Sequence, residues 1–139
     1  MSDKVFVDTN LFVYAKLDND NNTEKRERLE EFFKTISNEI LISTQVINEI
    51  YSAMMKNKVS DEDIQEMINQ ILIDVEVSIV VVSTIKLAWE LKKKYNLSYW
   101  DSLIVSTALE SGCEILYSED MQHNQLINDK LTIKNPFLE

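Results

Sequence analysis

The sequence predicts an α/β fold in which a parallel sheet of four to five strands is layered between helices. Short apolar runs rich in β-branched residues alternate along the chain with longer segments whose apolar residues recur at helical spacing. Nearly continuous apolar runs of this kind are typical of strands that helices cover on both faces. The chain has 139 residues, of which 45% are hydrophobic, and fits a single domain over 1–139.

The first half of the chain is expected to contain two strands and four helices. The strands are short apolar runs, and the helices place apolar residues on one face at i, i+3, i+4 and i+7. Ser60 is expected to cap the fourth helix, with Asp63 completing its capping box. In chain order the ranges are a strand at 5–7, a helix that starts after Asn10, a helix from 23 to about 38, a strand at 40–42, a helix from about 44 to 57 and a helix that starts after Ser60.

The second half is expected to contain three strands and two helices. The β-branched run 78–82 predicts a third strand that is covered on both faces. Gly112 is expected to end the last helix in a left-handed conformation. The remaining ranges are helices at about 84–95 and 98–111, a strand at 114–117 and a strand at 131–133.

The composition excludes several kinds of active site. One glycine and one proline leave no Gly-rich phosphate loop and no dinucleotide-binding fingerprint. A single histidine, His123, and a single cysteine, Cys113, exclude zinc sites built from several of these residues and also Ser-His-Asp catalysis. Cys113 lies beside an apolar run and is expected in the core. Any chemistry must therefore use carboxylates.

The charge and the apolar runs limit the surroundings in which the protein works. With 24 acidic and 14 basic residues the net charge is −10, which disfavours a protein that coats long nucleic acids. This charge does not disfavour an enzyme that gathers carboxylates around cations. No apolar run approaches the roughly 18 residues of a membrane span, and residues 1–5 lack the apolar segment of a signal peptide. We expect a cytoplasmic protein without membrane contact.

Carboxylates from four segments are expected to meet in one crevice. Asp8 follows the first strand directly, and Asp120 lies just beyond the fourth. If these strands are neighbours where the strand order reverses, both side chains open at the carboxyl ends of the strands, where ligand sites gather. Asp101 lies in the first turn of its helix, and Glu49 lies in the helix after the second strand.

Each of these residues also has a purely structural explanation. Asp8 or Asn10 would cap the first helix, and Asp101 would complete a capping box with Ser98, each worth about 1 kcal/mol or less. Glu49 lies outside the apolar stripe, as a solvated surface residue does. However, two ionised carboxylates about 4 Å apart repel by roughly 4 kcal/mol at an effective dielectric constant near 20. A cluster of four therefore needs raised pKa values or cations, and oxygen ligands suit Mg²⁺ or Mn²⁺.

The same segments resemble the PIN domain, and most closely the VapC-type ribonuclease toxins of bacterial toxin–antitoxin pairs. The resemblance runs in order through nearly the whole chain, in 5–10, 45–49, 98–104 and 116–121 through 135–137. It implies a three-layer sandwich with strand order 3-2-1-4-5. It also implies a catalytic, metal-binding quartet with supporting polar groups. The quartet is Asp8, Glu49, Asp101 and Asp120, and the supporting residues are Thr9, Asn10 and Ser118.

This resemblance implies an endoribonuclease that hydrolyses RNA phosphodiester bonds with one or two Mg²⁺ or Mn²⁺ ions and leaves a 5′-phosphate and a 3′-hydroxyl. It also implies a homodimer and a cognate antitoxin that lays an apolar helix over the toxin and sends a basic side chain into the crevice. The chain departs from its relatives at two places. Gln122 stands where many have a further acidic residue, so a fifth carboxylate is either missing or replaced by Glu119, and Asn124 stands where many have a glycine, with Asn the next best residue for a left-handed turn.

Positive charge for binding RNA is expected at Lys92, Lys93 and Lys94, with Lys25, Arg26 and Arg28 as further candidates. A solvated helix face explains both groups of residues better, and Lys92, Lys93 and Lys94 also lie where a helix C-terminus favours cations. His123 is interpreted as a surface or turn residue rather than a catalytic base.

Two other functions are compatible with an α/β sheet. The first is a catalytically inert PIN-like interaction module, against which the complete quartet argues. The second is a phosphotransfer domain. It fits poorly, because Ser83 stands where a receiver domain has its phosphoacceptor Asp and Asn10 where an aspartate-based phosphatase has its second Asp.

Overall fold

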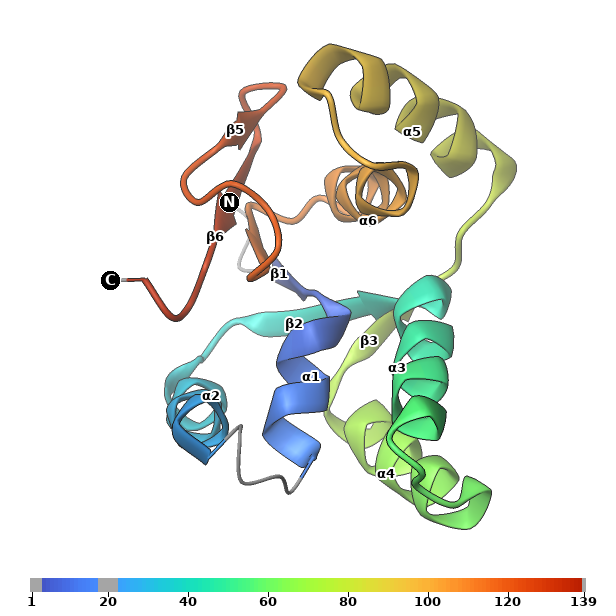
Figure 1. Cartoon of the computed structure of the whole chain (residues 1–139). Coiled ribbons are helices and arrows are strands. Elements are labelled where there is room, and N and C mark those ends of the chain that lie inside the picture. The colour runs from blue at the N-terminus through green and yellow to red at the C-terminus, as the bar shows by residue number, and fades with distance from the viewer. Residues whose placement is uncertain (1–3, 18–22, 139) are drawn as a thin grey trace.

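The computed structural model describes residues 4–17 and 23–138 (Figure 1). Six strands form one sheet in the order β3-β2-β1-β4-β6-β5. Every pairing is parallel except that of β5 with β6. The strands are β1 (Lys4–Val7), β2 (Glu39–Ser43), β3 (Glu76–Ser78), β4 (Ile115–Tyr117), β5 (Leu126–Ile127) and β6 (Leu131–Lys134). The α/β class and the order 3-2-1-4-5 are confirmed, with β6 as the predicted fifth strand.

Helices cover both faces of the sheet. Figure 1 shows α5 and α6 on one side and α1 to α4 on the other. Their bounds are α1 (Thr9–Lys16), α2 (Thr23–Thr35), α3 (Thr44–Lys56), α4 (Asp61–Asp74), α5 (Val82–Tyr95) and α6 (Tyr99–Glu110). None of the helices in the described ranges combines the length and apolar character that a membrane span requires.

The central strand β1 holds the core together and leads into the site. Its residues Val5, Phe6 and Val7 are fully buried. Phe6 pairs with Leu41 of β2 on one side and with Leu116 of β4 on the other. The chain crosses from β1 to β2 on one face and reaches β4 from the other, so the strand order reverses between β1 and β4. In an open α/β sheet this reversal creates a crevice at the carboxyl ends of the strands.

The prediction of a third strand at 78–82 is wrong in its bounds. The observed β3 spans Glu76–Ser78, and α5 begins at Val82, two residues before its predicted start. Ile79 and Val82 are 71% and 66% exposed, so this apolar run is not covered by helices on both faces. The register explains the early end of β3. Ser78 pairs with Ser43, the last residue of β2, and a longer β3 would have no partner strand.

The antiparallel strand β5 has only two residues and was not predicted from the sequence. It joins β6 through a tight turn in which Asn128 and Asp129 have φ values of 49° and 58°. Asn and Asp enter this left-handed region more readily than most residues, although Asn-Gly is the stronger hairpin signal. A pattern of period two cannot be recognised in so short a strand.

Several local predictions are confirmed. Gly112 has a φ of 79° just beyond α6, and Asn124 has a φ of 68°, the left-handed conformation expected there. Ser60 Oγ accepts the Asp63 N–H at 3.2 Å at the start of α4. Cys113 is 3% exposed, and burial raises the pKa of its thiol to about 12. It is therefore a core residue that stays protonated at neutral pH.

Candidate active site

The four predicted acidic residues line one cavity at the carboxyl end of β1. Asp8 follows β1, Glu49 lies in α3, and Asp101 lies in the first turn of α6. Asp120 follows β4 by three residues. The cavity has a volume of about 290 Å³, and its other lining residues include Thr9, Asn10, Ser52 and Lys56. The fold thus brings together carboxylates from distant parts of the chain.

Asp8 is the most buried of the four, with 5% of its surface exposed. Its Oδ1 accepts the Thr9 N–H at 2.7 Å, which caps α1, and its Oδ2 accepts the Ser118 hydroxyl at 2.9 Å. Asp8 therefore serves as a helix cap and lines the cavity at the same time. Burial raises its pKa to about 6, and the nearby charges of Glu49 and Asp101 add to the rise, while the two hydrogen bonds oppose it.

Glu49 is held by two neighbouring side chains. Its Oε1 accepts the Thr9 hydroxyl at 2.6 Å, and its Oε2 accepts Gln45 Nε2–H at 2.8 Å. The helix pattern alone suggested a solvated residue, but Glu49 is half-buried in the structure. Gln45 was not singled out from the sequence, although its position one helical turn before Glu49 is a usable signal.

Ser118 and Asn10 fix the loop that carries Asp120. The fully buried Ser118 donates its hydroxyl to Asp8 and accepts the Asp120 N–H at 3.2 Å. Asn10 Nδ2–H donates to Asp120 Oδ2. Together with Thr9, which contacts both Asp8 and Glu49, these polar residues link three of the four carboxylates.

Asp101 is placed by the N-terminus of α6. Ser98 Oγ caps this helix by accepting the Asp101 N–H at 3.2 Å, as the sequence predicted. Desolvation is the main cause of a raised pKa at Asp101, with the charges of Asp120 and Glu49 also raising it. The pKa of Asp120 is likewise raised, by desolvation first and then by Glu119. This mutual repulsion is the condition under which a bound cation stabilises a cluster of carboxylates.

The donor set of this cavity fits Mg²⁺ or Mn²⁺. In residues 4–17 and 23–138, no three His, Cys, Asp or Glu side chains are already placed to hold a metal ion. Mg²⁺, however, usually keeps several waters and needs only one or two carboxylates, so a complete protein cage is not required. The cavity offers carboxylate, hydroxyl and amide oxygens, with no thiol or imidazole among its lining residues. Such oxygen-only surroundings suit hard divalent cations.

Glu119 is engaged elsewhere and does not line the cavity. Its Oε2 lies 2.6 Å from Lys25 Nζ, which also stands 4.5 Å from the centre of the Tyr14 ring and 5.4 Å from that of Phe137. Lys25 thus connects α2 to the loop after β4, and it is not free to contact RNA while this ion pair is formed. Gln122, in the position of the missing fifth acid, is exposed.

The predicted RNA-contacting lysines lie away from the cavity. Lys92, Lys93 and Lys94 form the C-terminal end of α5, and none of them lines it. Lys94 Nζ instead donates to Asn128 Oδ1 at 2.9 Å. Lys56, which was not predicted from the sequence, does line the cavity. Its position two helical turns after Glu49, on the same face of α3, is the signal that would have identified it.

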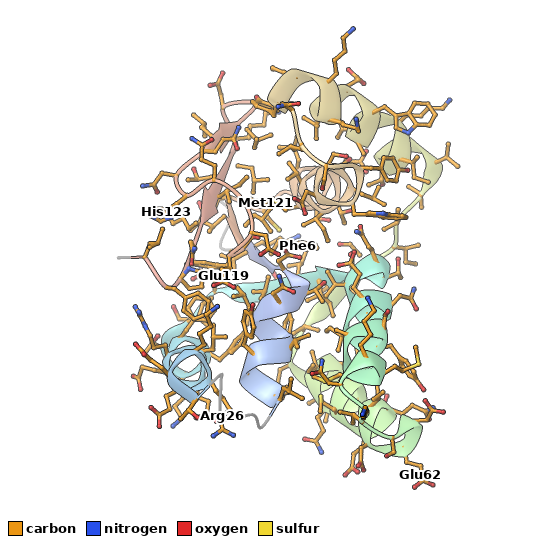
Figure 2. The ribbon with its side chains drawn as sticks, in the orientation of Figure 1. Phe6, Arg26, Glu62, Glu119, Met121 and His123 are labelled. Atoms are coloured by element: carbon orange, nitrogen blue, oxygen red, sulfur yellow. The ribbon has the colours of Figure 1, made fainter. Side chains whose placement is uncertain are left out.

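His123 has a structural contact in the turn before β5. Its Nδ1 accepts the Asn135 N–H at 2.9 Å. Figure 2 shows His123 at the outer edge of the molecule, whereas Phe6 of β1 lies near its centre. The interpretation of His123 as a turn residue rather than a catalytic base agrees with this contact, since His123 does not line the cavity.

Known proteins share this architecture. VapC20 of Mycobacterium tuberculosis, a sarcin-ricin loop cleaving toxin, is 14% identical and superposes with a TM-score of 0.65, over 81% of this chain and 86% of its own. VapBC2 of Rickettsia felis, bound to a DNA fragment from its promoter, is 22% identical and has a TM-score of 0.66, with 95% of this chain and 98% of its own covered. DNA-bound VapBC of Salmonella typhimurium is 18% identical and has a TM-score of 0.69, with 98% of this chain and 99% of its own covered. A comparison with curated proteins gave no match.

A family model provides the remaining evidence. The model of the PIN domain matches residues 5–126, which is well over half of the chain. The matched range extends from β1 to β5 and contains every acidic residue of the cavity. The chain therefore belongs to the PIN domain family.

Proposed function

We propose that this protein is a Mg²⁺- or Mn²⁺-dependent endoribonuclease that cuts RNA at the cavity lined by Asp8, Glu49, Asp101 and Asp120. The observation that carries the proposal is the convergence of these four carboxylates on one cavity of a PIN domain. The raised pKa values of Asp8 and Asp101 support it: burial is their main cause, and the charges of neighbouring carboxylates of the cavity add to the rise, which a bound cation would offset. One or two ions would bind there.

The chain's own residues would keep the carboxylates oriented. A bound divalent cation supplies a water of lowered pKa and neutralises charge that develops on the phosphate. Thr9 and Ser118 hold both oxygens of Asp8, and Thr9 and Gln45 hold both oxygens of Glu49. Because these carboxylates are already oriented, they need not move when the reaction occurs. Water would add to phosphorus and the bond to the 3′-oxygen would break, which leaves a 5′-phosphate and a 3′-hydroxyl.

The RNA footprint is expected to be small. The net charge of −10 leaves little positive surface for a long strand. Lys56, which is exposed and lines the cavity, is the nearest candidate for a phosphate contact. Lys92, Lys93 and Lys94 would extend the contact beyond the cavity.

We also infer that the protein is the toxin of a toxin–antitoxin pair. Its fold is similar to that of the VapC20 toxin and to that of two DNA-bound VapBC proteins. A cavity of about 980 Å³ between α1, α2 and α4 has a mixed lining, in which Phe12, Phe33 and Ile71 lie beside charged residues such as Lys16 and Asp74. An antitoxin helix would lay its apolar face on this cavity. We also expect the nuclease to be cytoplasmic and to form a homodimer.

The chemical ends of the product test the proposed reaction. RNA incubated with the protein and Mg²⁺ should give fragments with a 5′-phosphate and a 3′-hydroxyl, because a water attacks phosphorus. Ligation of the fragments without prior phosphorylation, followed by sequencing, measures this. Fragments that end in a 2′,3′-cyclic phosphate would contradict the proposal, since they require attack by the ribose hydroxyl instead.

Metal binding can be measured without cleavage. At an Mn²⁺ concentration of ten times Kd, binding to the folded state adds about 1.4 kcal/mol, which raises the melting temperature of a domain of this size by roughly 5 °C. Asp101→Asn should reduce this shift, because the variant removes one carboxylate from the cavity. Glu62→Gln, on α4 and outside the cavity, is the matched control and should keep the full shift. Equal shifts in both variants would place the metal elsewhere, and no shift at all would favour the inert interaction module.

A further inference from the structure

A second hollow adjoins the carboxylate cavity and contains an exposed tryptophan. Trp100 immediately precedes Asp101 in α6 and is 62% exposed. It lines a cavity of about 450 Å³ together with Val80 and Leu103. Glu49 and Ser52 line this cavity as well as the carboxylate cavity, so the two hollows share a wall in α3.

The main chain of Trp100 is tied to the carboxylate cavity. The Trp100 carbonyl accepts Gln45 Nε2–H at 3.2 Å, and the same amide group holds Glu49. The ring itself packs edge to face against Tyr99, with centroids 5.0 Å apart and an interplanar angle of 79°, and leaves much of its surface exposed. A tryptophan offers a large stacking surface and has only two side-chain torsions to restrain on binding.

The lining of the second hollow suits a flat ring. Trp100, Val80 and Leu103 give it an apolar surface, and Gln45 at its edge is engaged, since its Nε2–H group donates to Glu49 and to the Trp100 carbonyl. Each RNA base has a flat face that stacks on an aromatic ring.

We propose that this hollow receives one unpaired RNA base, which stacks on Trp100 while a neighbouring phosphate lies at the carboxylates. The inference rests on the proposed nuclease function and adds a base-binding subsite to it. Glu49 and Ser52 line both hollows, so the base subsite lies beside the proposed site of cleavage. Stacking on an aromatic ring tolerates every base, so Trp100 would hold the strand in position without strict sequence readout.

The chain has two tryptophans, which makes a direct binding measurement possible. Trp89 in α5 is 56% exposed and lines neither hollow. In a Trp89→Phe protein, Trp100 is the single tryptophan, and its fluorescence should be quenched by a single-stranded oligoribonucleotide in Ca²⁺, a divalent cation used here to neutralise the carboxylates so that a phosphate can lie beside them. An oligomer of the same length made of abasic nucleotides should not quench it. Quenching by neither oligomer would overturn the inference, whether or not the protein cuts RNA.

Cleavage provides a second, separate measurement. Trp100→Ala should lower kcat/KM on the oligoribonucleotide about tenfold to a hundredfold, the range expected for one base–aromatic stack. Trp100→Phe should retain most of the activity, and Trp89→Ala is the control that should match wild type. A wild-type protein that cuts no RNA with Mg²⁺ or Mn²⁺ would contradict the proposed function, but quenching of Trp100 would still support the base subsite.

The oligomeric state separates RNA binding from contact between copies of the chain. Analytical ultracentrifugation should give the same mass for Trp100→Ala, Trp89→Ala and wild type. If Trp100→Ala alone dissociates and loses activity on all substrates in proportion, the tryptophan belongs to an interface between two copies, and the inference is overturned.

Discussion

The Asp8→Asn variant is expected to lose RNA cleavage by more than about a hundredfold while its metal-free form becomes more stable. Altering even an outer partner of a metal ligand typically costs 10- to 100-fold, and Asp8 would itself be a ligand. The stability gain has a different origin. Asp8 is 5% exposed, and its burial together with the charges of Glu49 and Asp101 disfavours its ionised form. Asn keeps an oxygen for the Thr9 N–H without that charge.

The raised pKa sets the size of this gain. A rise from 3.8 to about 6 corresponds to about 3 kcal/mol between the two protonation states, so the variant should be more stable at neutral pH by an amount of this order. Urea unfolding in EDTA measures the free energy of unfolding, and a cleavage assay in Mg²⁺ measures activity. A variant that is less stable than the wild type in EDTA would contradict the expected gain, and would mean that the carboxylate of Asp8 stabilises the metal-free fold through the Ser118 hydroxyl that it accepts.

The metal-free wild type is expected to become less stable, relative to Asp8→Asn, as the pH rises. Because the folded state holds the Asp8 proton more tightly than the unfolded chain, it gains stability that is fully present below the unfolded pKa of 3.8 and is lost as the pH rises through about 6. The difference in free energy of unfolding between the two proteins should change by about 3 kcal/mol across this window.

Urea titrations in EDTA at a series of pH values measure this difference. Other carboxylates with raised pKa values, among them Asp101 and Asp120, titrate in both proteins and largely cancel. Saturating Mg²⁺ should flatten the dependence, since a bound cation favours the ionised carboxylate. A difference that is constant with pH would show that Asp8 ionises normally in the folded protein.

Local patterns were sufficient for most of the fold. Hydrophobic periodicity identified the six helices of the described residues, whereas the neighbouring positions of β1 and β4, which bring Asp8 and Asp120 into one crevice, were only assumed from the sequence and implied by the resemblance to the PIN domain. The third strand was misplaced because its end depends on its partner, as Ser78 pairs with the last residue of β2. The strand β5 was missed because two residues show no periodicity.

The environment of the site depended on tertiary packing. The helix pattern alone could not show that Thr9 reaches Glu49 from α1, because that contact requires α1 and α3 to pack side by side. The same holds for Trp100, whose hollow forms only where α6 meets α3. Lys56 and Gln45 have a usable helical spacing from Glu49, but spacing alone does not distinguish a cavity from solvent.

The measurement that tests the central claim most directly is RNA cleavage by the wild type and Asp8→Asn, each with Mg²⁺ or Mn²⁺ and with excess EDTA. The claim is that the four carboxylates bind a divalent cation and use it to cut RNA. We predict cleavage by the wild type with metal, its loss in EDTA, its recovery when Mg²⁺ exceeds the chelator, and a loss of more than about a hundredfold in Asp8→Asn. Cleavage that survives both EDTA and the substitution would contradict the claim.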